Sequence, residues 1–266
     1  MSAPDLVSVA VYERTIAASL ERIWENVLDW EHLPGLHRGS FTAIRCLEAG
    51  ENGWRARLRG RGADASSEIE VEVRLDRPRL RYVTATTEGV GAGTEIWTTL
   101  RPKQPHATEL RVEFLLPGAP PARVDALGHG YTTLYTRLWD EDEAMMVRRE
   151  SMLARLATLP PRGAESLELG ALAELRARVP LLVELDGRVF RVLALGEDLV
   201  AHATVCPHML GPLEDASPVG DTLECPWHRY RFDLRTGRSC DGRGLRLMPA
   251  PQVVIGPDER VSLTFR

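Results

Sequence analysis

Two short segments in the C-terminal part of the chain each combine a cysteine with a histidine, and they constrain the fold more than any other feature. The first is Cys206-Pro-His208, and the second, after a gap of 16 residues, is Cys225-Pro-Trp-His228. Thiolates and imidazoles in such pairs are metal ligands, and they can share one centre only if two loops each deliver one of each kind. The sequence therefore predicts a small domain built to hold two such loops.

These four residues could serve two kinds of metal centre. One is a [2Fe–2S] cluster in which two histidines replace two cysteines on one iron. The other is a zinc site with the same ligands. Zinc fingers place their second pair on a helix, whereas both pairs here lie between strand-like runs and each cysteine is followed by proline. The surroundings favour the iron–sulfur cluster, with zinc as the alternative.

The sequences CPHMLGPL and CPWHRYRFDLRTGR closely resemble the two cluster-binding loops of Rieske proteins, including the FDLxTG that follows the second loop. The resemblance implies that Cys206 and Cys225 bind the inner iron of a Rieske [2Fe–2S] cluster, and that His208 and His228 bind the outer, more exposed iron. Because neutral histidines replace anionic cysteines, we expect a higher reduction potential than in an all-cysteine cluster. Such a cluster would accept electrons from a ferredoxin or flavin reductase.

The rest of the composition indicates an ordinary soluble protein. The net charge of −5 and the scattered arginines argue against nucleic-acid binding, and no stretch of apolar residues is long enough to cross a membrane. The N-terminal sequence lacks the features of a signal peptide, so we expect a cytoplasmic protein. Cysteines in a reducing compartment are more often ligands or free thiols than disulfide partners. Cys46 and Cys240 have no histidine close by in sequence and are expected to be partly buried free thiols.

The first part of the chain predicts an α+β domain. Residues 7–14 read as a strand, and Ser19 can cap a helix that Pro34 and Gly35 should end. Alternating residues from 41 to 116 predict an antiparallel meander, and residues 122–157 predict a long helix. Together they predict a helix-grip fold, in which the sheet wraps around the long helix and leaves a cavity for a small ligand.

The Pro/Gly-rich composition after the long helix predicts a domain boundary. We expect a helix-grip domain at 1–158, a linker at 159–166 and a small all-β domain at 167–266. The glycine-rich sequence GVGAG at 89–93 lies between two predicted strands, so we reject it as a dinucleotide site.

A second metal motif is expected near the end of the first helix. The sequence ENVLDWEHLPGLH at 25–37 resembles the non-haem iron motif of Rieske oxygenases, EN followed by D-x-x-H-x-x-x-x-H, which implies that His32 and His37 bind Fe(II). Residues five apart on a continuous helix diverge by roughly 140°. We expect Pro34 to end the helix just after His32, so that His37 can return from the loop.

The third ligand is expected on the long helix, in the sequence WDEDE. Helical geometry places Asp142 roughly 40° from Leu138, within the apolar stripe of that helix. A buried carboxylate costs several kcal/mol unless its charge is compensated, and a metal would do so. The segment also resembles the ED-containing helix of Rieske oxygenases that carries the third ligand. Asp142 is therefore the expected ligand, with Glu141 the second choice.

The same resemblance implies a role for Asp29, three residues before His32. In Rieske oxygenases this aspartate bridges a cluster histidine of a neighbouring subunit to an iron-binding histidine, as part of the electron path. The domain order is reversed here, because those enzymes usually carry the Rieske domain first. The resemblance implies a homo-oligomer, such as a trimer, in which electrons pass between subunits. The reversed domain order weakens this expectation, since electrons could also pass within one chain.

The residues and the resemblance together predict a Rieske-type non-haem iron oxygenase. It would take electrons from a separate reductase or ferredoxin and use O2 to hydroxylate, dealkylate or desaturate a small apolar or aromatic substrate. The aromatic residues expected to line its pocket are Trp54, Trp97, Phe114 and Tyr135.

Two alternatives remain open. One is a Rieske electron-transfer or redox-sensing protein with a ligand pocket and no catalytic iron. The other resembles a polyketide cyclase or aromatase with an accessory cluster, in which His32 and His129 act as acid–base groups.

Overall fold

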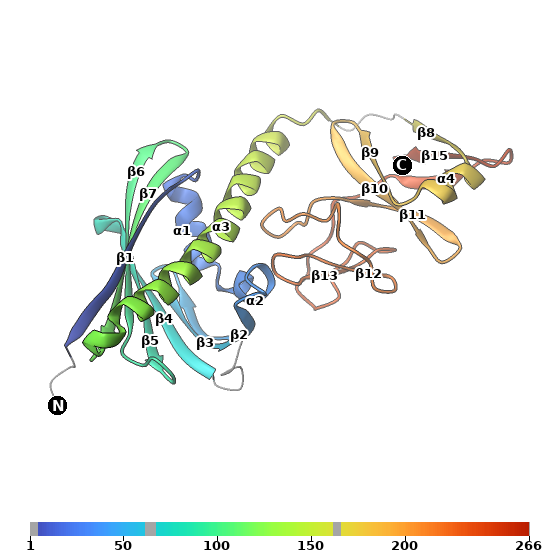
Figure 1. Cartoon of the computed structure of the whole chain (residues 1–266). Coiled ribbons are helices and arrows are strands. Elements are labelled where there is room, and N and C mark those ends of the chain that lie inside the picture. Colours follow the sequence, from blue (N-terminus) through green and yellow to red (C-terminus); the bar gives the residue numbers. More distant parts are fainter. Residues whose placement is uncertain (1–4, 62–67, 162–165, 266) are drawn as a thin grey trace. The chain divides into compact units, whose positions relative to one another are not determined.

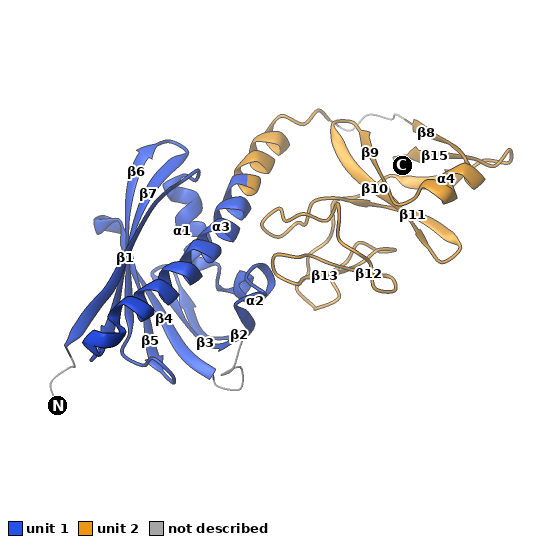
Figure 2. Cartoon of the chain, viewed as in Figure 1, with its two compact units in different colours: residues 1–147 blue, residues 148–266 orange. Residues whose placement is uncertain are grey.

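The computed structural model describes residues 5–61, 68–161 and 166–265 (Figure 1). The chain divides into two compact units, unit 1 at Met1–Val147 and unit 2 at Arg148–Arg266 (Figure 2). This division falls within the long helix α3, so that residues 148–157 of the helix belong to unit 2. Residues 162–165 of the linker predicted at 159–166 lie outside the described residues.

Unit 1 is a seven-stranded antiparallel sheet with a long helix, and it confirms the predicted helix-grip fold. Strands β2 to β7 form a meander in chain order, and β1 closes it by pairing with β7 (Figure 1). The elements of the sheet and its long helix are β1 Leu6–Ile16, β2 Phe41–Gly50, β3 Gly53–Gly60, β4 Glu68–Asp76, η2 Arg77–Arg79, β5 Arg81–Glu88, β6 Glu95–Gln104, β7 Ala107–Pro117, η3 Pro121–Arg123 and α3 Val124–Ala157.

Alternation along β7 explains how the sheet meets α3. Every second residue of β7 from Thr108 to Leu116 is buried, so one face of the strand belongs to the core. On that face Phe114 stacks on Tyr131 of α3 and contacts Tyr135 edge to face, with ring centroids 5.1 and 4.8 Å apart. The core face of the sheet therefore packs directly on the helix.

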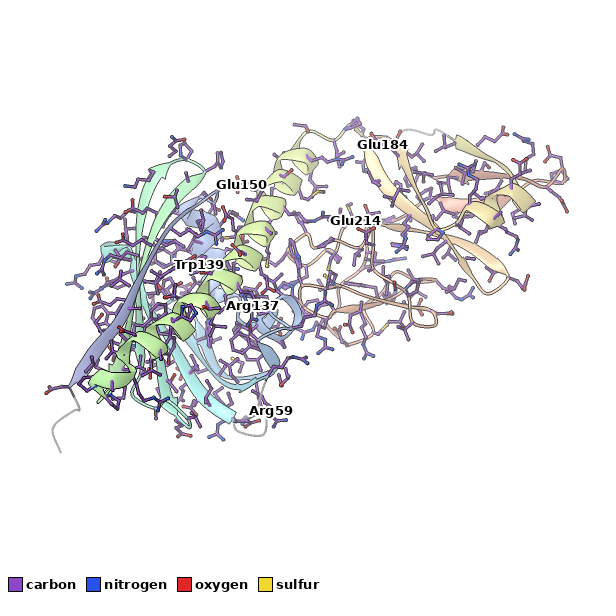
Figure 3. All side chains as sticks on the ribbon, viewed as in Figure 1. Arg59, Arg137, Trp139, Glu150, Glu184 and Glu214 are labelled. Carbon is purple, nitrogen blue, oxygen red and sulfur yellow. The ribbon has the colours of Figure 1, made fainter. Side chains whose placement is uncertain are left out.

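A glycine lets α3 come close to β1. A Cβ atom added at Gly128 would lie 2.4 Å from the carbonyl oxygen of Val9, well inside contact distance. Further along α3, Trp139 is buried in the core, while Arg137 donates a hydrogen bond to Ser40 Oγ at 2.7 Å (Figure 3). The contacts of Trp139 and Arg137 hold α3 in place within unit 1.

The segment between β1 and β2 differs from its prediction. Ser19 caps helix α1 (Leu20–Leu28) as expected. The helix then ends at Leu28, a short turn η1 (Trp30–His32) follows, and a new helix α2 (Leu33–Leu36) begins. Pro34 was expected to end a helix, but it lies in the first turn of α2, where a missing N–H costs nothing.

Unit 2 consists mainly of short strands in three small antiparallel sheets. Two sheets have three strands, in the orders β11-β10-β9 and β14-β15-β8, and the third pairs β12 with β13. The elements are β8 Ser166–Ala171, α4 Leu172–Arg178, β9 Leu181–Leu185, β10 Arg188–Leu195, β11 Asp198–Ala203, β12 Thr222–Glu224, β13 Arg231–Asp233, β14 Gln252–Ile255 and β15 Arg260–Thr264.

Helix α4 is a short helix in a part of the chain that was expected to consist almost entirely of short strands. Its sequence LAELRAR consists of strong helix formers, and Leu172 and Leu175 lie at helical spacing with Leu175 buried. Among the helices that the structure describes, none combines the length and the apolar sequence needed to cross a lipid bilayer.

Candidate metal centres

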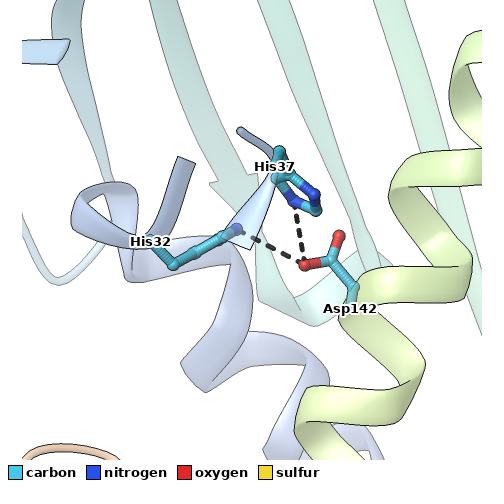
Figure 4. Close-up of side chains that lie close together, drawn as sticks. All are labelled: His32, His37 and Asp142. Atoms are coloured by element: carbon cyan, nitrogen blue, oxygen red, sulfur yellow. Dashed lines mark ion pairs between the residues drawn. The ribbon is translucent and has the colours of Figure 1, made fainter. Parts of the chain in front are cut away.

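His32, His37 and Asp142 converge in unit 1 (Figure 4). His32 is the last residue of η1, His37 follows the end of α2, and Asp142 lies on α3. The Nε2 atoms of His32 and His37 lie 3.4 and 3.2 Å from the same oxygen, Oδ1 of Asp142. One ligand atom from each residue lies within 4.8 Å of the others, a spacing that would allow a single metal ion to bind all three.

The other atoms of these side chains are held by neighbours. His37 Nδ1 lies 2.6 Å from Glu141 Oε2, and His32 Nδ1 contacts the backbone oxygen of Asp29. Asn26 Nδ2 donates to Asp142 Oδ1 at 3.0 Å. When Nδ1 of each imidazole donates its proton to these oxygens, Nε2 carries the lone pair that a metal needs.

Glu141 and Asn26 make contacts with the three residues that the sequence did not predict. Glu141 was the second choice for a metal ligand, whereas its carboxylate contacts His37 from behind. Asn26 belongs to the EN pair of the motif, which signalled its importance but not its contact with Asp142. Asp140 is exposed and pairs with Arg14, in keeping with its position away from the apolar stripe.

The three residues form a buried, charge-coupled group. The exposed fractions of His32, His37 and Asp142 are 5%, 1% and 8%. Burial alone would lower the pKa of His32, but hydrogen bonds to Asp142 and Asp29 outweigh it and raise the pKa to about 10. Burial would raise the pKa of Asp142, yet the adjacent imidazoles lower it well below its ordinary value. A carboxylate held ionised between two imidazoles is suited to a divalent cation, which would displace the proton from His32.

A cavity of about 330 Å³ opens beside these residues. Trp54 and Tyr135 line it, as predicted. Trp97 and Phe114 are absent from its described lining, because Phe114 is fully buried behind Tyr131 and Tyr135, and the Trp97 indole donates to Glu95. His129 is exposed and is also absent from the described lining, which removes one acid–base group of the cyclase alternative.

In unit 2, the two predicted cysteine ligands lie side by side. Cys206 and Cys225 are both 0% exposed, and their thiols are hydrogen-bonded to each other. That contact raises the pKa of Cys206 and lowers the pKa of Cys225. Each loop is closed by its own backbone: Cys206 N donates to Gly211 O at 2.9 Å, and Cys225 N donates to Tyr230 O at 2.8 Å.

The two predicted histidine ligands also lie together. The rings of His208 and His228 are 4.3 Å apart between centroids and almost perpendicular, at 88°. Gly211 leaves room for the first loop, since a Cβ atom there would lie 2.8 Å from Cys225 Sγ. Two adjacent thiols and two adjacent imidazoles on opposing loops fit the donor set of a Rieske cluster.

A tyrosine and an arginine that the sequence analysis did not single out pack on these histidines. The ring centroid of Tyr230 lies 4.4 Å from that of His208 and 5.6 Å from that of His228. Arg243 lies over the Tyr230 ring at 4.1 Å and donates to its hydroxyl at 2.9 Å. Tyr230 could have been suspected from its place in the second loop motif, whereas nothing in the sequence indicated Arg243.

The remaining cysteines are free thiols, as expected. Cys46 is half-buried, but Cys240 is exposed, which corrects the expectation that it is partly buried. In its segment, RSCDGRG, Arg238 and Ser239 form isolated bridges and residues 240–243 form a bend.

Comparison with known proteins assigns the C-terminal part of the chain. A family model described as "Rieske [2Fe-2S] domain" matches residues 165–250. The chain therefore contains a Rieske domain, which implies a [2Fe–2S] cluster. The ferredoxin component of a p-cumate 2,3-dioxygenase system from Pseudomonas putida is 34% identical over 67 residues, which cover 25% of this chain. The match spans about half (52%) of that relative's length.

Solved structures match the two parts separately. The ferredoxin of carbazole 1,9a-dioxygenase from Nocardioides aromaticivorans is 25% identical, with a TM-score of 0.32, and the match covers 38% of this chain and 98% of that one. A truncated norcoclaurine synthase from Thalictrum flavum is 19% identical, with a TM-score of 0.42, and the match covers 54% of this chain and 96% of that one. The Rieske domain itself supports a role in electron transfer.

Proposed function

We propose that this chain is a Rieske-type non-haem iron oxygenase component with its two metal centres in reversed order. The observation that carries the proposal is the buried group His32, His37 and Asp142 in unit 1, in the same chain as a Rieske domain. Two histidines and one carboxylate are the ligand set of non-haem Fe(II) oxygenases. A Rieske domain alone would only carry electrons, whereas this second site gives the electrons a destination.

The residues of unit 1 have separate tasks in this proposal. His32, His37 and Asp142 would bind the iron, while Glu141 and the backbone of Asp29 fix the two imidazoles through Nδ1. The cavity beside them would hold a small apolar or aromatic substrate and exclude bulk water. With both groups bound, the iron would supply O2 activation and the Rieske cluster the electrons for it.

The residues of unit 2 would hold the cluster and receive electrons. Cys206 and Cys225 would bind the buried iron, and His208 and His228 the outer one. The donor would be a separate ferredoxin or flavin reductase. Asp29 remains the proposed electron-transfer bridge, because its carboxylate oxygen Oδ2 lies 3.7 Å from His32 Nδ1. The bridged cluster could belong to the same chain or to another copy in a homo-oligomer.

A second candidate function is an electron-transfer or redox-sensing protein whose cavity binds a ligand without catalytic iron. The observation that favours it is the similarity to the ferredoxin component of a p-cumate 2,3-dioxygenase system. The two candidates differ in the amount of iron. The oxygenase requires about three irons per chain, and the carrier about two.

Metal analysis of the purified full-length chain separates these candidates. After anaerobic reconstitution with Fe(II) and removal of loosely bound metal, we expect about three irons and about two inorganic sulfides per chain. The variant His37→Ala should lose about one iron and keep both sulfides. A wild-type chain that retains about two irons in every preparation would eliminate the oxygenase and leave the carrier.

A further inference from the structure

Tyr135 carries an unused polar group inside the cavity of unit 1. Its ring packs edge to face on Phe114, and its side chain lines the cavity. The described residues provide no hydrogen-bond partner for the Tyr135 hydroxyl. Burial raises the pKa of this tyrosine well above its ordinary value, so the hydroxyl remains a donor at any physiological pH.

The hydroxyl of Tyr131 is already engaged. Tyr131 lies one helical turn before Tyr135 on α3, lines the same cavity, and has Thr94 as a side-chain hydrogen-bond partner. The side chain of Tyr135 is partly buried and lines the cavity, so a ligand that offers an acceptor would gain one hydrogen bond from its hydroxyl. Of the two tyrosines, Tyr135 is therefore the one with a donor to offer.

Tyr135 and Asp142 share one face of α3. They are seven residues apart, which corresponds to two turns and to about 10.5 Å along the axis. Leu138 lies between them on the same face and also lines the cavity. A ligand lying along this face would have one end at the metal residues, an apolar middle, and an acceptor within reach of Tyr135.

The charges around the cavity limit what this ligand can be. The cavity lining, within the described residues, includes no lysine and no arginine. A divalent ion in the metal site would bring two positive charges, but the carboxylates of Asp29, Asp142 and Glu141 lie within its immediate surroundings. These acids match or exceed the charge of the ion, so the wall offers nothing to compensate a buried anion.

We propose that the cavity selects a neutral, mainly apolar molecule that carries a hydrogen-bond acceptor, such as a ketone, held by the hydroxyl of Tyr135, and that it rejects carboxylates. This molecule is a substrate only if the proposed oxygenase function holds, so that part of the inference rests on the proposed function. Its binding does not, because the cavity and Tyr135 are present whether or not iron is bound, and in the iron-free chain the carboxylates of Asp29, Asp142 and Glu141 outnumber the protonated His32.

Three probes of similar size and shape test the proposal: acetylnaphthalene, ethylnaphthalene and naphthoate, all substituted at the same ring position. Each is titrated calorimetrically under nitrogen into the full-length chain with its metal sites loaded. We expect acetylnaphthalene to bind about threefold to tenfold more tightly than ethylnaphthalene, the usual effect of one hydrogen bond. Naphthoate should bind at least about tenfold more weakly than acetylnaphthalene, because its charge is uncompensated.

Two phenylalanine variants assign the effect to one hydroxyl. Tyr135→Phe should remove the advantage of acetylnaphthalene and leave ethylnaphthalene unchanged. Tyr131→Phe, the matched control on the same helix, should keep that advantage. The retained binding of ethylnaphthalene also shows that the variant is folded.

Several results would overturn the proposal. The first is that naphthoate binds as tightly as acetylnaphthalene. The second is that Tyr135→Phe keeps the preference for acetylnaphthalene over ethylnaphthalene. The third is that no probe binds at its solubility limit. This outcome is independent of the iron count. If the chain holds only the cluster and still prefers the ketone, the proposed oxygenase is wrong and the proposed ligand class stands. If the chain holds all three irons and prefers naphthoate, the proposed ligand class is wrong and the oxygenase stands.

Discussion

Single residues determine what the proposed metal site of unit 1 can do. Asp142 is a carboxylate in the buried face of a helix, where its charge is stabilised by two imidazoles that both approach Oδ1. Each imidazole in turn is oriented by an oxygen behind it, Glu141 for His37 and the backbone of Asp29 for His32. The geometry therefore depends on the residues behind the ligands as well as on the ligands themselves.

Glu141→Gln tests this dependence. An amide in place of the carboxylate should weaken the hold on His37 and lower the affinity for Fe(II) by about 10- to 100-fold, the usual effect of losing such a partner. Titration of the metal-free site with Fe(II) measures the affinity. Asp140→Asn is the matched control, since the neighbouring carboxylate is exposed and pairs with Arg14. Equal affinities of the Glu141 variant and the wild type would contradict the assigned role.

We expect His202 to make the stability of unit 2 depend on pH. It is 2% exposed on β11, its Nδ1 lies 2.9 Å from the Ala203 carbonyl oxygen, and its Nε2 has no partner among the described residues. Burial lowers its pKa in the folded state, and Arg191 adds to this. The unfolded chain therefore binds the proton first, and stability should fall as the pH decreases below about 6.5 towards the lower folded-state pKa.

The expected loss of stability at low pH is measured by thermal unfolding at several pH values. The visible absorption of the cluster monitors the unfolding of unit 2. His202→Gln, which cannot take up a proton, should reduce the decrease in melting temperature on the acid side. His129→Gln, at an exposed histidine, is the control and should leave it unchanged. Identical pH profiles for wild type and His202→Gln would rule out the role of this histidine.

At the scale of elements, the break between α1 and α2 brings the two histidines together. The prediction of a single helix ended by Pro34 was wrong, because the chain already leaves α1 at Leu28 and restarts with Pro34 in the first turn of α2. Proline fits either place, after a helix or at its start, and local sequence does not distinguish them. The consequence was predicted correctly all the same: His37 lies back beside His32, with ring centroids 5.0 Å apart.

Gly128 controls how closely α3 packs on the sheet. A Cβ atom there would lie 2.4 Å from Val9 O, so Gly128→Ala should push the helix from β1 and destabilise unit 1 by about 1–3 kcal/mol. Gly130→Ala meets nothing within 4 Å and should stabilise by up to about 1 kcal/mol through helix propensity. Chemical unfolding monitored by circular dichroism compares them. A Gly128→Ala variant as stable as Gly130→Ala would refute the close packing.

Across the whole molecule, the sequence predicted best where a pattern is local and periodic. Alternation in β2 to β7 and the long apolar stripe of α3 specified the helix-grip fold, and the Cys–His spacing specified the Rieske loops. Contacts between distant segments could not be predicted, because no local pattern pairs Glu141 with His37 or Arg243 with Tyr230. Strand alternation also does not show that Trp54 lines the cavity while Phe114 lies behind its wall.

The proposed oxygenase requires a Rieske cluster and a mononuclear iron site in one chain. Electron paramagnetic resonance of the dithionite-reduced chain, before and after addition of nitric oxide, detects both centres in one sample. We expect a Rieske signal together with a high-spin ferrous–nitrosyl signal, and we expect His32→Ala to lose the nitrosyl signal and keep the Rieske signal. A Rieske signal alone in the iron-reconstituted wild type, or a nitrosyl signal that survives in His32→Ala, would contradict it.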